Sequence, residues 1–154
     1  MEKLDTIDRR LLSELQDNGR ITNVELARRV GLTAPPCLRR VRALEEAGLI
    51  RGYHAELDPA KLGYAITVFA MVSLKSQAEP DLRQFEDHMR GLPEVRECHM
   101  LNGEIDFILK IVSRDLQSFQ EFLTSKLTPA PNVASVKTSL TIRTAKLLPG
   151  VPVD

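Results

Sequence analysis

The chain has 154 residues and equal numbers of basic and acidic side chains, 21 of each, so its formal net charge is zero. Its hydrophobic content of 43% is that of a folded protein, and no apolar run approaches the roughly 20 residues of a membrane-spanning helix. The length accommodates one ordinary domain or two small ones. The charged first residues lack the apolar stretch of a secretory signal, and we therefore expect a cytoplasmic protein.

The basic residues are unevenly distributed along the chain. Residues 1–54 contain ten lysines or arginines against eight acidic residues, a net charge of +2, and the remaining residues carry −2. Between residues 20 and 51, seven arginines stand against three glutamates, so the local net charge reaches +4. This cluster is a modest electrostatic footprint for binding phosphate groups.

The residue types that carry catalysis or bind metals form no recognisable motif. Cys37 and Cys98 lie far apart, and His54, His88 and His99 are scattered. No nucleophile, zinc or phosphate-loop signature is present. We therefore expect no catalytic residues, no metal ion, no cofactor and two reduced cysteines.

Two short helices are predicted in the first 30 residues. Apolar residues recur at helical spacing over residues 4–15, and Asp5 is suited to cap this first helix. Thr22 and Glu25 have the spacing of a capping box, so the second helix begins one residue after Thr22. Gly31 stands where a left-handed residue ends a helix.

A third helix follows after a short turn. Thr33 is suited to cap it, and prolines in the first turn are tolerated because the N–H groups there have no intrahelical acceptor. Cys37, Val41 and Leu44 form its buried stripe, and Gly48 stops it. The opposite side carries Pro35, Arg39 and Arg42.

These helices have the pattern of a helix-turn-helix, whose second helix enters the major groove of DNA. Alternating residues over 49–57 predict a strand or short ribbon, the wing. Arginine bonds guanine or phosphate with its planar fork, and helix N-termini receive phosphate oxygens. Short helices with solvated arginines also occur in domains that bind no DNA. We predict DNA contacts from Thr22, Asn23, Thr33, Ala34, Pro35, Pro36, Arg39, Arg40 and Arg42.

The hydrophobic period changes from 3.6 to 2 near residue 64, which indicates a domain boundary. Four strands and two amphipathic helices follow in the order βαββαβ, which is the order of a ferredoxin-like fold with both helices on one side of an antiparallel sheet. The strands are predicted at 64–75, 95–101, 105–112 and 133–146, and the helices at about 80–92 and 115–126.

The expected fold class is α+β. We expect a winged helix-turn-helix domain at 1–54, a linker at 55–63 and a ferredoxin-like domain at 64–154. Because the first predicted strand is apolar on both faces and the helices cover only one, the other face should pack against a second subunit in a homodimer. Coverage by the N-terminal domain of the same chain is the alternative.

A polar turn stands between the second and third predicted strands. Asn102 and Gly103 form a strong hairpin signal. Backbone N–H groups of such a turn can bind a carboxylate, and Asp106 can pair with an ammonium group, so the hairpin could bind an amino acid. The residues alone favour an ordinary hairpin tip.

Residues 33–53 closely resemble the Lrp/AsnC (leucine-responsive/asparagine regulator) family of prokaryotic transcriptional regulators. The resemblance extends along essentially the whole chain, because residues 4–8, 17–20, 97–99 and 103–107 also match motifs of that family. It implies a sequence-specific DNA-binding regulator of genes for amino-acid metabolism or transport. It also implies dimers that commonly assemble to an octamer and bind an amino-acid effector between dimers.

The resemblance reverses the interpretation of the hairpin, which becomes an effector site. The implied effector-binding residues are Leu101, Gly103, Glu104 and Asp106, with Ser135, Thr138 and Leu140 from a neighbouring subunit.

Two other functions remain as alternatives on the residues alone. The first is a small-molecule-binding subunit that regulates an enzyme and uses its N-terminal helices for docking; it would show no salt-dependent DNA binding. The second is a ferredoxin-like enzyme, which needs an acid, a base or a metal set that the sequence does not provide.

Overall fold

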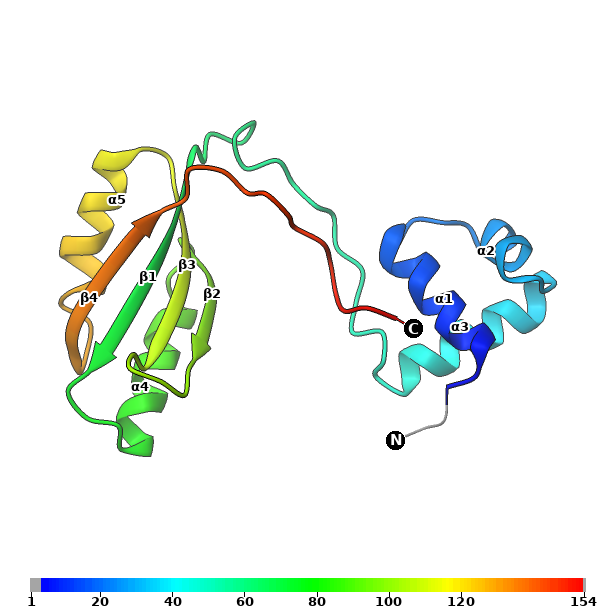
Figure 1. Ribbon diagram of the computed structural model, residues 1–154, viewed down its shortest axis with the longest axis horizontal. Helices are drawn as coiled ribbons and strands as arrows, with labels where there is room; N and C mark the ends of the chain where they lie inside the picture. The colour runs from blue at the N-terminus through cyan, green and yellow to red at the C-terminus, as the bar shows by residue number, and fades with distance from the viewer. Residues whose placement is uncertain (1–3, 154) are drawn as a thin grey trace. The chain divides into compact units, whose positions relative to one another are not determined.

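The computed structural model describes residues 4–153 and divides the chain into two compact units, each of which is described by itself (Figure 1). The helical unit consists of the residues up to Glu56 together with those from Lys146 onward. The sheet unit consists of Leu57–Ala145. No helix among residues 4–153 is long and apolar enough to cross a membrane.

The helical unit contains the three predicted helices. The caps lie close to their expected places: Asp5 is the N-cap of the first helix, and Gly31, with a φ of 76°, ends the second in the left-handed conformation. Apolar residues from all three helices form one core, with Leu11 and Cys37 fully buried. The helices are α1 (Thr6–Asp17), α2 (Asn23–Val30) and α3 (Ala34–Glu46).

The capping box lies at α1 and not at α2, where it was predicted. Asp5 Oδ1 accepts a hydrogen bond from Asp8 N at 2.8 Å, and Asp8 Oδ2 accepts one from Asp5 N at 3.4 Å. At α2, Thr22 Oγ1 does accept from Glu25 N at 3.2 Å, but the Glu25 carboxylate binds two arginines. Charged donors one turn away are stronger partners for a carboxylate than a neutral backbone N–H, so only half of the box forms.

The predicted strand over residues 49–57 is wrong, because this segment has no helix or strand. A strand requires a second strand whose N–H and C=O groups pair with its own. In the described part of the helical unit, no such strand is present. The segment is instead tied to α3 by a side chain: the Tyr53 hydroxyl donates to Glu45 Oε1 at 2.8 Å.

The sheet unit has the predicted βαββαβ order. All strand pairs are antiparallel, and the strands lie side by side in the order β2-β3-β1-β4 (Figure 1). The second helix continues into one turn of π-helix, η1. The elements are β1 (Ile66–Leu74), α4 (Glu79–Arg90), β2 (Val95–Met100), β3 (Phe107–Ser113), α5 (Leu116–Phe122), η1 (Leu123–Leu127) and β4 (Val133–Leu140).

The strands around the hairpin are shorter than predicted. The usual two-residue turns require positive φ at the first central position or at both, and neither Asn102 nor Gly103 has it. The loop therefore spans residues 101–106, and Leu101 N donates to Asp106 O at 2.8 Å to close it. The last strand also ends early, at Leu140 and not at residue 146.

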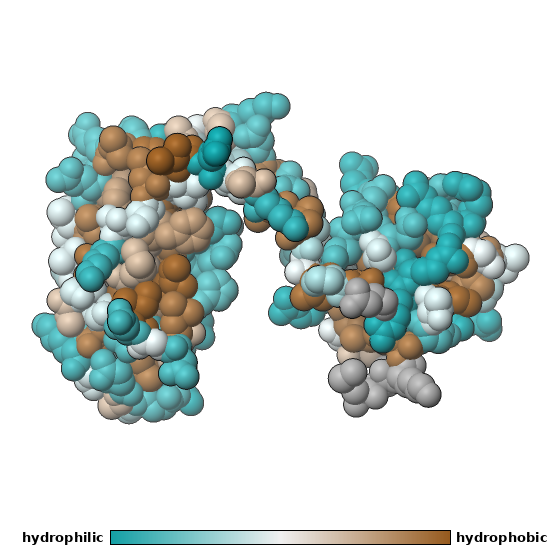
Figure 2. All heavy atoms as spheres, in the orientation of Figure 1, coloured by the Kyte–Doolittle hydropathy of each residue, from teal (hydrophilic) through white to brown (hydrophobic). Residues whose placement is uncertain are grey.

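The sheet buries one of its faces within the chain. Alternate residues of β1 face α4 and α5 and are buried, and the Phe85 and Phe107 rings meet there at a centroid distance of 4.8 Å. On the other face, Phe69 is 37% exposed and pairs in register with Lys110 and Ser139. Apolar side chains gather over the strands in Figure 2. The predicted one-sided coverage by helices is confirmed.

The lowered pKa of Glu25 makes the free energy of unfolding depend on pH. Hydrogen bonds from Arg28 and then Arg29 hold the pKa of Glu25 at about 2, below its ordinary value of 4.5. Because the folded-state pKa is the lower one, the ionised carboxylate stabilises the fold above pH 4.5, and this contribution is lost as the pH falls toward 2. We expect a higher urea-unfolding midpoint in wild type than in Glu25→Gln at neutral pH, and convergence on acidification.

The matched control is Glu46→Gln, because Glu46 is exposed and has no hydrogen bond or ion pair within residues 4–153. This variant should unfold like wild type throughout the titration. A difference between wild type and Glu25→Gln that stays constant down to pH 2 would contradict the assignment.

Candidate functional site

The turn between α2 and α3 is fixed by a side chain. Asn23, the first residue of α2, donates from Nδ2 to the Ala34 carbonyl at the start of α3 over 2.8 Å. This bond holds the N-termini of the two helices together, so their free N–H groups lie side by side. Thr33 occupies the N-cap of α3 but makes no capping hydrogen bond, which leaves its hydroxyl free to bind a ligand.

The outer side of α3 carries two unpaired cations. Arg39 and Arg42 are exposed, and neither has a hydrogen bond or ion pair within the described residues. Pro35 is exposed on the same side, as the helical spacing predicted. Leu38 is also 39% exposed there and was missed, although its position on the helical wheel would have found it. The surface thus offers both charge and an apolar contact.

Arg40 has a different environment from its neighbour Arg39. Its Nη1 lies 2.7 Å from Asp5 Oδ2 and 2.7 Å from Asp8 Oδ1, so it joins α3 to the N-terminus of α1. The Asp8 backbone N–H and then the Arg40 guanidinium lower the pKa of Asp5. Arg40 therefore supports the position of α3 and is not presented on its outer side.

The other arginines of residues 20–51 also fall into two groups, those in ion pairs and those without one in the described chain. Arg28 and Arg29 pair with Glu25, and Arg29 also pairs with Glu14 at 2.9 Å. The local charge of +4 is thus partly neutralised by internal pairs. Within the described chain, the arginines of residues 20–51 without an ion pair are Arg20, Arg39, Arg42 and Arg51.

In the sheet unit, Asp106 fastens the hairpin loop to the end of β1. Its Oδ2 accepts from Leu74 N at 2.6 Å and from Gln77 Nε2 at 3.4 Å. Its own backbone N–H donates to Val72 O at 3.0 Å. A carboxylate has about four acceptor positions, so Asp106 retains capacity to bind an ammonium group through Oδ1.

Asn132 holds the same end of β1 from the opposite side and was missed by sequence reasoning. It adopts a φ of 66°, which asparagine tolerates better than most residues. Its Oδ1 accepts from Ser76 N at 3.0 Å, and its Nδ2 donates to Ser76 O at 2.7 Å. The end of β1 beside the loop is thus a rigid platform.

The predicted effector residues do not all come together in one chain. Leu101, Gly103 and Glu104 are exposed in the loop beside Asp106, and Ser135 pairs with Ser73 near the same end of the sheet. Leu140 pairs with Val68, whereas the loop binds β1 at Val72, whose carbonyl accepts from Asp106 N. Val68 and Val72 are four residues apart, which is about 13 Å along the strand at roughly 3.3 Å per residue. Thr138 lies two residues before Leu140 and is exposed.

Two cavities of the described chain lie away from these residues. One of about 710 Å³ belongs to the helical unit, and one of about 370 Å³ lies between α4 and β2. Neither includes residues 101–106 or 135–140.

The cysteines and histidines form no metal centre in the part of the chain that the structure describes. Both cysteines are free thiols, Cys37 in the helical core and Cys98 on β2. Burial raises the pKa of the Cys98 thiol to about 11. The protonated thiol is a poor nucleophile and a poor metal ligand.

Comparison with known families matches both units. Residues 4–51 match the winged helix-turn-helix DNA-binding family, and residues 67–151 match the Lrp/AsnC ligand binding domain. The first match covers α1, α2 and α3 with their connections, and the second covers nearly all of the sheet unit.

Individual proteins are similar over almost the whole chain. A leucine-responsive regulatory protein of Rhizobium meliloti is 55% identical over 144 residues, which cover 94% of this chain and 92% of the relative. The Bkd operon transcriptional regulator of Pseudomonas aeruginosa is 41% identical over 152 residues, 99% of each chain. The crystal structure of a Neisseria meningitidis transcriptional regulator in complex with L-Met has a TM-score of 0.93 and 36% identity over 97% of each chain.

Proposed function

Since this chain belongs to the Lrp/AsnC family of DNA-binding transcriptional regulators, we propose that it controls genes of amino-acid metabolism or transport in response to an amino acid. Proteins of this family are regulators and not enzymes, so the alternative of a ferredoxin-like enzyme is set aside. The compartment of action is that of the DNA, the cytoplasm.

The surface that carries this proposal is the outer side of α3. Arg39 and Arg42 are exposed and unpaired within the described chain, while Arg40 and Asn23 fix the helix from behind. In the major groove, such arginines bond guanine edges or phosphates, and Leu38 packs against a thymine methyl group. Thr22, Thr33 and the helix N-termini, including Ala34, Pro35 and Pro36, then approach the DNA backbone.

Replacing Arg39 and Arg42 tests this surface. We expect each alanine substitution to weaken operator binding by about 10- to 100-fold and, where the arginine binds phosphate, to reduce the slope of log affinity against log salt by about one. Fluorescence anisotropy with fragments selected from genomic DNA measures both quantities.

The control is Arg83→Ala on α4, which also removes one exposed positive charge but lies in the sheet unit. It should leave both quantities unchanged. If the double variant Arg39→Ala, Arg42→Ala bound DNA like wild type, the groove assignment would be wrong.

One operator half-site carries too little sequence information for selection, so a dimer is the expected functional unit. The open sheet face supports this proposal, because Phe69, Met71 and Ile108 lie on it without helix coverage. Two lysines lie on this face: Lys110 is paired with Glu97 at 2.9 Å, and Lys137, which pairs in register with Met71, is exposed. The apolar residues of this face would form the core of an isologous interface, with the lysines at its polar rim.

Phe69→Glu tests the dimer. Two copies of an unpaired carboxylate would be buried in an isologous interface, so we expect the dimer dissociation constant to rise by about a hundredfold or more. Analytical ultracentrifugation measures it, with circular dichroism as the check on folding. Leu116→Glu is the control, since Leu116 is exposed on α5 at 62% and should not affect assembly. Equal sedimentation of both variants would exclude this interface.

A second interface is proposed for the assembly to an octamer. Leu140 at the end of the edge strand is 50% exposed, and Ile142 is 96% exposed, which leaves apolar surface for a further contact. Leu140 lies about 13 Å along β1 from the residue that binds the loop, so an effector that touches both the loop and Leu140 would reach two chains, whereas Thr138, opposite Ala70, lies nearer. We therefore place the amino acid between neighbouring copies, with Ser135 beside it.

Two substitutions of Asp106 separate its structural and ligand roles. Asn retains an oxygen for the Leu74 N–H and removes the charge, whereas Ala removes both. We expect both variants to bind the effector about tenfold or more weakly in a calorimetric titration with a panel of L-amino acids, including leucine and methionine. Hydrogen exchange at Leu74 should accelerate only in Asp106→Ala.

Asp87→Asn, which removes an exposed charge from α4, serves as the control. If Asp106→Asn bound an amino acid as tightly as wild type, the pairing with the ammonium group would be ruled out. DNA binding without an amino acid would remain measurable in all three variants, so the two halves of the proposal are tested independently.

The proposed mechanism is thermodynamic linkage. An amino acid that binds two arrangements of the oligomer with different affinity shifts their populations, and the spacing of paired α3 helices shifts with them. DNA affinity then follows the effector concentration.

A further inference from the structure

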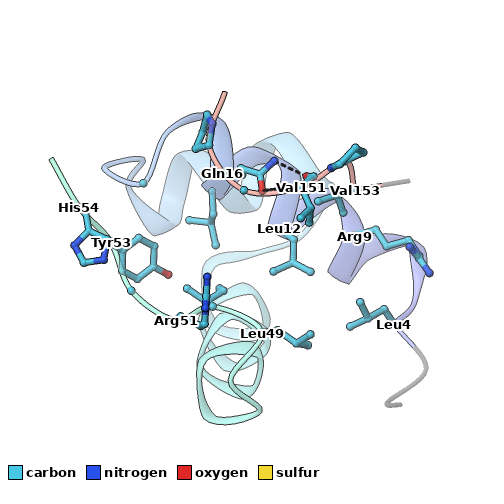
Figure 3. A pocket seen from close by; sticks show the side chains of 17 residues that line it. Leu4, Arg9, Leu12, Gln16, Leu49, Arg51, Tyr53, His54, Val151 and Val153 are labelled. Carbon is cyan, nitrogen blue, oxygen red and sulfur yellow. Dashed lines mark hydrogen bonds between the residues drawn. The ribbon is translucent and has the colours of Figure 1, made fainter. Parts of the chain in front are cut away.

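The end of the chain belongs to the helical unit. Residues 149–153 lie in a groove between α1 and the segment of residues 49–54, as Figure 3 shows. The groove encloses the cavity of about 710 Å³, and its apolar lining includes Leu12, Leu15 and Ile50. The fold of the three helices alone does not require this segment, since its residues take no part in their buried core.

Gln16 of α1 binds the backbone of this segment at one residue. Its Nε2 donates to Val151 O at 2.8 Å, and its Oε1 accepts from Val151 N at 3.2 Å (Figure 3). A residue of a neighbouring strand makes the same pair of opposed bonds, so the side-chain amide acts as a substitute for a peptide group. The Val151 side chain is 67% exposed, which means that the backbone is what is recognised.

Gly150 fits this contact for two separate reasons. Its φ is +64°, a conformation that residues with a Cβ rarely adopt. A Cβ at this position would also overlap the Gln16 side-chain amide. At Gly31, Gly48 and Gly63, which have positive φ too, an added Cβ would meet nothing within 4 Å. The close approach of the chain end to Gln16 thus depends on the absence of a side chain at residue 150.

We propose that residues 149–153 are a docking segment and that the groove beside Gln16 is an interaction surface whose occupant is this chain's own C-terminal segment. The chain leaves the helical unit after Glu56 and re-enters it from Lys146. Docking therefore gives the helical unit a second, non-covalent connection to the sheet unit, in addition to the chain that follows Glu56. While the segment is docked, both connections limit the movement of the helical unit, and its release leaves one.

The docked segment is held by few contacts and is expected to exchange between docked and released states. Its anchors are the two bonds to one glutamine, and most of its residues are exposed. Any change that pulls on the residues after β4 acts directly on these bonds. The docking segment is in this sense a reversible tether.

Hydrogen exchange of the full-length chain tests the docking. Among residues 147–153, Val151 has the one amide that donates a hydrogen bond within the described structure, and Pro149 and Pro152 have no amide proton. Exchange in the C-terminal peptide therefore reports on this contact. We expect the Val151 amide to exchange about fivefold more slowly than in an unstructured peptide, and Gln16→Ala to abolish the difference.

Substitutions at residue 150 distinguish the backbone strain of a positive φ from the overlap of a Cβ with the Gln16 side chain. Asparagine tolerates positive φ but carries a Cβ, so Gly150→Asn should release the segment through its overlap with Gln16. In the Gln16→Ala background the same substitution should have no further effect. The control is Gln117→Ala, at an exposed position of α5, which should leave the Val151 amide as protected as in wild type. Unchanged exchange across α1 in every variant shows that the helical unit is folded.

Two results would overturn the proposal: a Val151 amide that exchanges at the unstructured rate in wild type, or one that stays protected in Gln16→Ala. A mixture of two chains then identifies the source of the segment. One chain carries Gln16→Ala, and the other has Gln16 but lacks residues 149–154, so docking within a chain is impossible. We expect no protection of Val151 in this mixture, and protection would show that another copy supplies the segment.

Discussion

The sheet of this protein can bury only one of its faces within the chain, because both crossover helices return to the same side. The covered face holds the continuous core around Phe85 and Phe107, whereas Phe69 on the other face is 37% exposed and no helix of residues 4–153 covers it. An apolar sheet face open to water is unfavourable, and a second copy is the simplest cover. The proposed pairing of the DNA-binding helices and the proposed effector site between chains both depend on this one-sided coverage.

In the helical unit, polar contacts orient α3, whose outer side is the proposed DNA-binding surface. The apolar core packs the three helices, but Asn23 fixes the turn between α2 and α3, and Arg40 ties α3 to α1. Asn23 and Arg40 thus stabilise the arrangement of the helices. Their neighbours Arg39 and Arg42 remain exposed and without an ion pair in the described chain, so the consecutive arginines Arg39 and Arg40 have different environments.

The sheet unit uses its polar residues in a comparable way. Asp106 and Asn132 hold the end of β1 from two sides, which makes the hairpin loop a fixed part of the surface. A ligand bound at such a loop meets a preformed site and loses little free energy in ordering it. The C-terminal segment has the opposite character, since it is anchored by one glutamine and remains largely exposed.

The sequence by itself determined the helices, the βαββαβ order and the outer side of α3, because hydrophobic period and capping residues act locally. It also indicated the family, through motifs distributed over the whole chain. It did not determine which arginines are free, since Arg40 differs from Arg39 only through Asp5 and Asp8, more than 30 residues away. The wing failed as a strand for a related reason: strand formation needs a partner, which local alternation does not guarantee. Only the tertiary structure brought Gln16 to Val151, a contact across 135 residues that leaves no periodic signal in the chain.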